Sequence, residues 1–416
     1  MTRRLLIGAE VALVVLLLTG ALLFLRTFVS LRNVDLGFER DHVWAVSTRW
    51  PVGRLAGPTG TRSWPRIQRG VDGLIENVAA VPGVEAVGLI SDVPLTGAPY
   101  SGTVWRDDAP GAAGVSPPPD PRYRWKADLS VVTPGYFAAL AIPFVRGRNF
   151  SDMDRWSDEQ LNATTVPDGG AVIVNQAFAS RYFGSEDPVG RALVLYDDQT
   201  FGWHRTIVGV VADVRGRAVA QAAEPGVFVP HAQHPDVFLP SLIVRTLLPA
   251  ASVAPALRDR IAAYDPQLLV QRIRPMDKVV AGALSRPRFN LLLVGSFAGV
   301  GLLLAAVGIY GVVSYLVAQR TREIGIRMAL GAAARDVRRL VVRDGMIPVA
   351  MGSIGGVAAA IPASRAIASL LYGVAPLDPI SLALAPALLG AVAFAACVLP
   401  ARRAARVDPL IALRDQ

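Results

Sequence analysis

The chain has a single cysteine, Cys397, among its 416 residues, which excludes a fold held together by a framework of disulfide bonds. Only 18% of the residues are charged and 52% are hydrophobic, which excludes an intrinsically disordered chain because apolar residues at this density are buried. Soluble domains carry roughly 25% charged residues. Together with a mean hydropathy of +0.40, the shortage of charge indicates a protein that lies partly in a membrane.

The motifs of common hydrolytic enzymes are also missing. No G-x-x-x-x-G-K-[ST] loop is present, and neither Lys126 nor Lys278 lies in a glycine-rich setting, so ATP hydrolysis by that route is excluded for this chain. H-E-x-x-H, G-x-S-x-G and S-x-x-K are absent as well. His231 and His234 form an H-x-x-H pair, which falls short of the usual three or four ligands of a zinc site. We therefore expect neither a catalytic site nor a metal site, and interpret the chain as a non-enzyme.

The position of the charge is more informative than the net value of +9. Residues 29–289 hold 27 basic and 26 acidic residues, whereas segments 1–4, 319–345 and 400–416 hold 13 arginines and five acidic residues. The two remaining basic and two remaining acidic residues cancel. A nucleic-acid-binding protein would concentrate positive charge on a folded domain, so no nucleic-acid partner is expected. The pattern instead indicates how the chain is oriented in a membrane.

Apolar runs of about 20 residues are long enough to cross a bilayer as helices. Arg3 and Arg4 precede the first run, which raises the alternative of a cleavable signal peptide. That run is long for a signal core and no clean A-x-A site follows it, so a retained anchor is favoured. The third-from-last run, at 290–318, is longer than the bilayer requires and should tilt or project beyond it. The four predicted spans are 5–25, 290–318, 346–371 and 380–399.

Short loops that are rich in arginine mark the cytoplasmic side of a membrane protein. Arg3 and Arg4, the loop 319–345 and the C-terminal tail are basic, whereas the loop 372–379 has no basic residue. Four spans with both termini in the cytoplasm satisfy all of these constraints. Residues 29–285 then lie outside the cytoplasm as one insertion between the first and second spans.

The inserted segment mixes strand-like and helical patterns, which predicts an α+β domain. It has too much sequence for one core, so two lobes are expected, with the Pro/Gly-rich stretch 107–122 as an exposed loop or lobe connection. It also lacks cysteine and must hold its fold without disulfides. Predicted strands are 43–49, 84–90, 171–174, 206–214, 226–229 and 241–246. Predicted helices are 65–80, 175–183, 251–264 and 276–284, with Asn175 and Ser252 as caps.

Two pairs of glycines in the apolar runs have the spacing of close helix packing: Gly295 with Gly299, and Gly352 with Gly356. Packing within the chain and packing in a dimer are both open. Glu10 and Arg365 lie within predicted spans but near their ends, where long side chains reach the interface, so no proton-relay role is favoured.

The loop 319–345 interleaves charged residues with apolar ones, among them Ile324, Ile326 and Leu330. A fully solvated charge run has no such pattern. A short amphipathic helix along the membrane face, available to a partner, is therefore predicted.

The run R-x-R-E-I-G-I-R-x-A-L-G-A at Arg320–Ala332 resembles the signature of FtsX-like, MacB-type ABC transporter permeases. The tail Pro400–Arg414 is similar to the ending of that family. Matches to its MacB-type periplasmic core domain are Thr133–Phe137, Ile142–Arg148, Val174-Asn175, Tyr182-Phe183, Glu186–Gly190 and Ile207–Asp213. The resemblance covers nearly the whole chain. It is closest to one half, the second, of permeases that carry two such halves in tandem.

The resemblance implies a fold of four transmembrane helices, with the α+β core domain inserted between the first and second, in a bacterial inner membrane. It implies three parts: a first span at 1–28, a periplasmic core domain at 29–285 and an FtsX-like permease domain at 286–416. Relatives can be fused to an ATPase or to a second permease half, and these residues include neither. A subunit that pairs with itself and a fragment of a longer protein are both open.

Family members work by mechanotransmission, in which a cytoplasmic ABC ATPase moves the permease and reshapes its periplasmic domain. The implied partners are that ATPase, a second permease half or second copy, a membrane-fusion protein and the lipid. ATP and Mg would lie on the ATPase, so no cofactor is expected on this chain. By residue match, the contacts to the ATPase are Arg322, Glu323, Ile324, Gly325, Arg327, Ala329, Leu330 and Gly331.

One alternative function stays open: a membrane-anchored regulator whose outer domain activates a cell-wall hydrolase or senses a ligand. Hydrolase-regulating relatives typically have smaller outer domains, which favours export. An ion-coupled transporter is disfavoured by four spans and few intramembrane charges. The sequence does not indicate the cargo.

Overall fold

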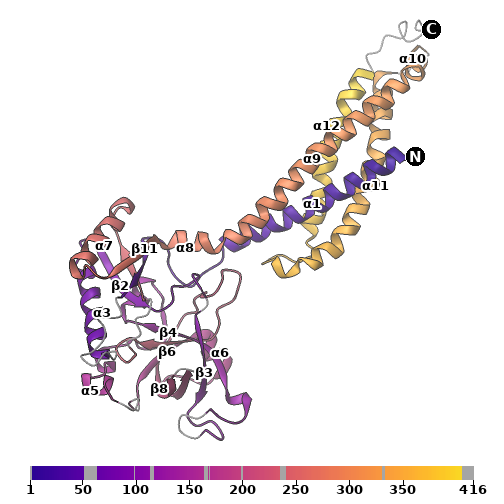
Figure 1. Ribbon diagram of the computed structural model, residues 1–416. Coiled ribbons are helices and arrows are strands. Elements are labelled where there is room, and N and C mark those ends of the chain that lie inside the picture. The colour runs from indigo at the N-terminus through magenta and orange to yellow at the C-terminus, as the bar shows by residue number, and fades with distance from the viewer. Residues whose placement is uncertain are drawn as a thin grey trace. The chain divides into compact units, whose positions relative to one another are not determined.

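The computed structural model describes residues 2–50, 63–97, 99–112, 117–163, 167, 169–197, 200–234, 240–329 and 333–404. It divides into two compact units, and Figure 1 shows that one is helical and the other mixes helices with strands. The helical unit combines residues 1–34 with residues 284–416, and the second unit is formed by residues 35–283. The latter is called the 35–283 domain below.

The helical unit contains four helices that are long and apolar enough to cross a membrane, as the sequence predicts. They are α1 (Thr2–Arg32), α9 (Ser285–Gln319), α11 (Ala334–Ala366) and α12 (Pro379–Ala404). The predicted bounds of the third span, 346–371, are wrong as helix bounds. Its helix begins at Ala334 because arginine is a good helix former, so helical structure continues through polar turns that hydropathy leaves out. It ends at Ala366, before the 3₁₀ turn η3 (Ala368–Leu370).

Helix α1 packs against α9, α11 and α12. The core between them consists mainly of small and β-branched residues, including fully buried Val11, Val15, Ala385, Ala393 and Cys397. Large apolar side chains such as those of Leu303, Val307 and Ile354 are instead exposed on the outside of the bundle. This inside-out distribution is typical of helices whose outer surface is covered by lipid, because lipid is as apolar as the side chains themselves.

The 35–283 domain contains a four-stranded antiparallel sheet in the order β11 (Leu269–Pro275), β1 (Val43–Arg49), β10 (Ser241–Thr246) and β2 (Val84–Ile90). Helices α3 (Trp64–Ala79) and α7 (Ala250–Tyr264) pack with it around one hydrophobic core. Helix α3 contributes Ile67, Val71, Leu74 and Val78, whose spacing places them on one face of the helix. We call this part the sheet lobe.

Six further strands form a closed ring. The neighbours are, in order, β4 (Trp125–Val132), β3 (Tyr100–Arg106), β7 (Ala192–Asp197), β8 (Thr200–Val211), β6 (Ala171–Asn175) and β9 (Gly226–Pro230). Parallel pairing of β9 with β4 closes the ring, which leaves these strands without open edges. It encloses a second hydrophobic core, and we call it the ring lobe. One residue pair, Ile90 with Val132, is the described strand pairing between the two lobes.

The remaining short elements are β5 (Phe144–Gly147), which pairs with β8, together with η1 (Pro121–Tyr123), α4 (Gly135–Ala139), η2 (Asp152–Asp154), α5 (Asp158–Leu161), α6 (Gln176–Tyr182), α8 (Met276–Ala283) and α10 (Thr321–Ala329).

Close backbone contacts explain why glycine occurs in two of the motifs that resemble the periplasmic core domain. A Cβ atom on Gly135 would lie 2.0 Å from the carbonyl oxygen of Val87, so α4 rests directly on β2. A Cβ on Gly209 would lie 2.4 Å from the carbonyl oxygen of Arg148, where β5 meets β8.

The predicted α+β class is confirmed, and five of the predicted strands coincide with observed ones within one residue. The predicted strand 206–214 is the later part of β8, which begins at Thr200 and ends at Val211. Five strands escaped prediction: β3, β4, β5, β7 and β11. Polar residues interrupt the apolar pattern of β3, β4 and β11, whereas β7 is an apolar run that was overlooked. Asn175 caps α6, as predicted, through its side-chain oxygen. Ser252 does not cap α7, because that helix already begins at Ala250 and the Ser252 hydroxyl donates back to the Pro249 carbonyl.

Candidate functional site: the loop helix, the glycine seam and the domain cleft

The arginine-rich segment 319–345 folds as the short helix α10 between the ends of α9 and α11. Its Ile324 side chain is 4% exposed and belongs to the core of the helical unit. Arg320, at the junction of α9 and α10, donates to the Asp344 carboxylate on α11 at 2.9 Å. Helix α10 is therefore attached to two long helices, by one apolar contact and one ion pair.

The opposite side of α10 faces outward. Ile326 is 43% exposed, and the exposed side chains of Glu323 and Arg327 form an ion pair one helical turn apart, at 2.6 Å. Of the residues that the resemblance assigns to ATPase contact, Arg322, Glu323, Ile324, Gly325, Arg327 and Ala329 lie on α10, whereas Leu330 and Gly331 lie outside the described residues. An exposed apolar residue beside a pair of charges is a surface suited to a protein partner.

A small pocket of about 30 Å³ lies where α10 meets the bundle, and apolar residues of α9 and α11 line it together with the charged residues of α10. On the last turn of α12, Arg403 donates to the Tyr310 hydroxyl of α9 at 2.9 Å. The beginning of the basic tail is thus tied to α9, and residues 405–416 lie outside the described part of the chain.

The predicted packing glycines divide into two groups. A Cβ atom on Gly352 would lie 2.5 Å from the Gly8 carbonyl oxygen, and one on Gly356 would lie 2.7 Å from that of Ala12. These two residues let the backbones of α11 and α1 touch, and we call this contact the glycine seam. On α9, in contrast, a Cβ atom added to Gly295 or Gly299 would have no described atom of another residue within 4 Å.

Other contacts of the bundle were not expected from sequence. Gly301 and Gly308 lie on the side of α9 that packs on α1, and a Cβ on Gly308 would lie 3.2 Å from a carboxylate oxygen of Glu10. Their spacing of seven residues is the available signal, since two helical turns return to the same face. Arg26 of α1 pairs with Asp378, which also accepts from the backbone N–H of Ser381 at 2.7 Å and so caps α12.

In the 35–283 domain, a cleft of about 500 Å³ lies between α3 of the sheet lobe and loops of the ring lobe. Ion pairs bridge the two sides: Arg155 to Asp72 and Arg69 to Asp158, both at 2.7 Å. Other carboxylates of the lining are those of Glu76, Asp152 and Asp154. Hydrogen bonding by Arg148 holds the pKa of Asp154 below its ordinary value against the opposing effect of burial.

His231 and His234 do not form a site together. His231 is 1% exposed, and burial lowers its pKa to about 3, so its imidazole is neutral at physiological pH. His234 instead lies between the rings of Trp64 and Trp203, at centroid distances of 6.5 and 4.6 Å. Within the described ranges, no group of three or more His, Cys, Asp or Glu residues is placed to hold a metal ion.

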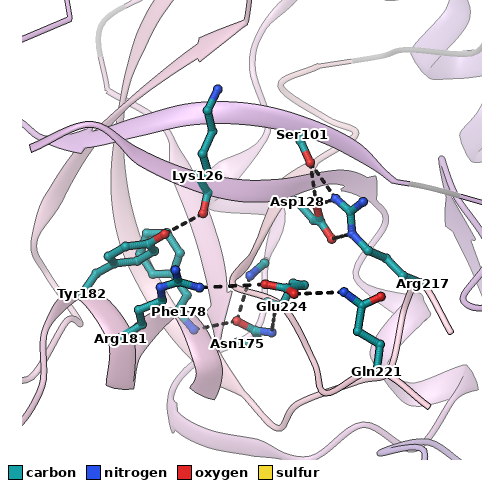
Figure 2. Close-up of polar contacts among 11 residues, drawn as sticks. Ser101, Lys126, Asp128, Asn175, Phe178, Arg181, Tyr182, Arg217, Gln221 and Glu224 are labelled. Carbon is teal, nitrogen blue, oxygen red and sulfur yellow. Dashed lines mark hydrogen bonds and ion pairs between the residues drawn. The ribbon is translucent and has the colours of Figure 1, made fainter. Parts of the chain in front are cut away.

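The polar residues in Figure 2 organise the ring lobe. The Asn175 side-chain oxygen accepts from the N–H groups of Phe178 and Gly226, both at 2.9 Å, and its amide donates to the Glu224 carbonyl. Arg217 pairs with Asp128, which also accepts from Ser101 at 2.8 Å. These contacts tie strands β3, β4, β6 and β9 together.

Comparison with known families decides the identity of this architecture. Residues 11–264 match the MacB-like periplasmic core domain, and residues 295–409 match the FtsX-like permease C-terminal region. The chain belongs to the FtsX-like permeases of the MacB type. The resemblance found in the sequence is thereby confirmed, as is the architecture of four apolar helices around an inserted α+β domain.

Relatives of this permease include the "Pyoverdine export ATP-binding/permease protein PvdT" of Pseudomonas entomophila, 30% identical over 66% of this chain and 41% of that protein. The "Macrolide export ATP-binding/permease protein MacB" of Azoarcus sp. is 30% identical over 68% of this chain and 41% of that protein. The chain thus spans less than half the length of these relatives. Among solved structures, the periplasmic region of MacB from Actinobacillus actinomycetemcomitans is 11% identical, with a TM-score of 0.37 over 60% of this chain and 95% of that one.

Proposed function

We propose that this permease couples ATP hydrolysis by a separate cytoplasmic ABC ATPase to movement of its 35–283 domain, in export or extraction of a substrate. The observation that carries the proposal is the two-sided attachment of α10. Ile324 and the Arg320–Asp344 pair fix the helix to the bundle, while Ile326 and Arg327 face outward. A push on the outward face would therefore displace α9 and α11 rather than bend a free loop.

The connections of the chain suggest how that displacement reaches the 35–283 domain. The domain is joined to α1 at one end and to α9 at the other, and these helices pack on each other through Gly301 and Gly308. The first and last strands of the domain, β1 and β11, pair with each other in the sheet lobe. Leu36, which follows α1 at the start of the domain, accepts a hydrogen bond at its carbonyl from the backbone N–H of Arg215, which follows β8 of the ring lobe. Movement of α9 against α1 would be received first by the sheet lobe and would change the cleft.

The proposed orientation places both termini and α10 in the cytoplasm of a bacterial inner membrane and the 35–283 domain in the periplasm. It is supported by the positive charge of 319–345 and of the tail. In this arrangement ATP and Mg belong to the ATPase, and a second permease half or a second copy completes the transporter. The names of the relatives join ATP-binding and permease functions, which supports an ATPase acting together with this permease.

The test is site-directed photo-crosslinking in native membranes. A photoreactive residue at Ile326, exposed on α10, should capture an ABC ATPase, which mass spectrometry identifies. The matched control is Leu388, an equally exposed apolar residue on α12, which should capture none. The proposal is overturned, in favour of a membrane-anchored regulator, if no ABC ATPase is captured at Ile326.

A further inference from the structure

Another cavity of the 35–283 domain, of about 150 Å³, lies between the start of α3 and the ring lobe, apart from the domain cleft. Three of the seven tryptophans of the chain line it: Trp64 at the start of α3, Trp156 before α5 and Trp203 on β8. His234 lies between the rings of Trp64 and Trp203. We call this cavity the tryptophan pocket. Its lining combines these indole rings with the apolar residues Leu161, Ala163 and Pro167, and such a lining favours a flat apolar guest.

Arg205 of β8 also lines the tryptophan pocket, although the residue is only 1% exposed. Its guanidinium carbon lies 4.7 Å from the ring centroid of Trp156 and 5.6 Å from that of Trp203. These two contacts stabilise the cation through the negative faces of the rings. Burial lowers the pKa of the guanidinium to about 10, so it remains charged at neutral pH.

The hydrogen-bonding capacity of Arg205 is mostly unused. A guanidinium has five N–H donors. Here Nη1 donates to the His204 carbonyl at 3.1 Å, and Nε has no partner in the described part of the chain. Among the described residues, no carboxylate forms an ion pair with it. Buried arginines are normally paired with an acid, because an uncompensated charge in an apolar setting is costly. By contrast, Arg155, which lines the domain cleft, pairs with Asp72, and Arg148 pairs with Asp154.

We propose that the tryptophan pocket binds an aromatic carboxylate, with the ring between the tryptophan faces and the carboxylate on Arg205. The carboxylate would supply both the missing counter-charge and acceptors for the unused N–H donors, which suit the two oxygens of a carboxylate. A volume of about 150 Å³ matches a cavity that holds one benzene-sized ring. This inference does not depend on the export function, since it concerns a ligand of the 35–283 domain alone.

The site is assembled from parts of the chain that are far apart in sequence. Trp64 comes from the sheet lobe, whereas Trp203 and Arg205 lie two residues apart on β8 of the ring lobe. Two residues apart on a strand, their side chains emerge on the same face. A ligand in the pocket would therefore contact both lobes.

The experiment is a ligand-observed NMR titration of benzoate into the full-length chain in lipid nanodiscs, with empty nanodiscs as the blank. Benzamide, the neutral analogue, should bind at least about 10-fold more weakly, because it lacks the charge that pairs with arginine. Arg205→Met should weaken benzoate binding by about the same factor. Arg191→Met is the matched control, since Arg191 is half-exposed and paired with Glu186; it should bind like the wild type.

A second variant keeps the test decisive if Arg205→Met fails to fold. Ala163 is an exposed residue that lines the pocket, so Ala163→Phe fills the cavity and leaves the buried arginine in place. It too should reduce benzoate binding at least about 10-fold. The proposal is overturned if the wild type binds no benzoate, if benzamide binds equally well, or if Ala163→Phe leaves binding unchanged.

Discussion

The two units of this permease are stabilised in different ways. In the helical unit, α11 and α1 meet at glycines, and the ion pair of Arg26 with Asp378 joins α1 to the start of α12. In the 35–283 domain, large aromatic and aliphatic side chains fill two cores, and ion pairs cross between lobes. The difference follows from the solvent. Lipid gives no hydrophobic drive for helices to associate, so close backbone approach replaces it; water provides that drive for the 35–283 domain.

The largest expected effect comes from breaking the glycine seam. Gly352→Leu should abolish a monodisperse, folded chain, because its first side-chain atom alone would lie 2.5 Å from a carbonyl oxygen of α1. The matched control is Gly295→Leu, at an equally spaced glycine with open surroundings. Size-exclusion chromatography and thermal denaturation in detergent compare the two. Equal losses of monodispersity and thermal stability in both variants would contradict a special role for the glycine seam.

A second prediction concerns how α10 transmits force. Gly325→Pro should insert normally into the membrane but lose ATPase coupling at least about 10-fold, since proline inside a helix removes a hydrogen bond and costs about 3 kcal/mol. Gly325→Ala favours the helix and should retain coupling. The measurement is the ATPase activity of the permease–ATPase complex in lipid nanodiscs, compared with that of the ATPase alone. Unchanged coupling in the proline variant would remove α10 from the mechanism.

A third prediction concerns how the stability of the 35–283 domain depends on pH. Buried His231 has its pKa lowered to about 3, so below its unfolded pKa of about 6.5 the unfolded state binds more protons than the folded state. The contribution of the neutral imidazole to the free energy of unfolding is therefore complete above about pH 6.5. It falls as the pH falls, by about 2 kcal/mol between pH 7 and pH 5.

Denaturant unfolding of the 35–283 domain within the full chain, followed at the two pH values, measures that loss. His231→Gln should flatten the dependence. The control, His42→Asn, changes an exposed histidine whose backbone has a φ of 60°, which asparagine tolerates, and should leave the dependence as it is. A wild-type domain equally stable at pH 5 and pH 7 would contradict the burial of a neutral imidazole.

The smallest expected effect is at the Arg320–Asp344 pair. Both side chains are partly exposed, so a double-mutant cycle with alanine should give a coupling energy of about 0.5 kcal/mol. Thermal unfolding of the single and double variants measures it. If the stability changes of the two single variants add exactly in the double variant, the ion pair contributes nothing and Ile324 alone attaches α10.

The sequence predicts the four apolar helices well because hydropathy depends only on local composition, and not on which helices pack against each other. It predicts strands such as β2 and β10 for a similar reason, since their apolar runs mark burial directly. It misses β3 and β11 because Tyr-Ser-Gly and Gln-Arg interrupt their pattern, and only pairing with distant strands makes them strands.

Contacts between distant segments limit the prediction of sites. The pairs Gly295/Gly299 and Gly352/Gly356 have the same spacing, yet the second pair faces α1 and the first faces no described atom, since a motif does not say which side of a helix is covered. A role for Gly295 and Gly299 in a dimer stays a prediction. Nor does the sequence reveal Arg205, because the residues that line its pocket are spread from Trp64 to His234.

The most direct test of the central claim is a distance measurement across the domain cleft. Spin labels at Glu76 on the sheet lobe and Met153 on the ring lobe, both exposed, are introduced as cysteines after Cys397→Ser removes the native thiol. Pulsed electron paramagnetic resonance then compares the complex with its ATPase before ATP is added and with ATP trapped. The account predicts a shift in the distance distribution that Gly325→Pro abolishes. Identical distributions in the two states would contradict it.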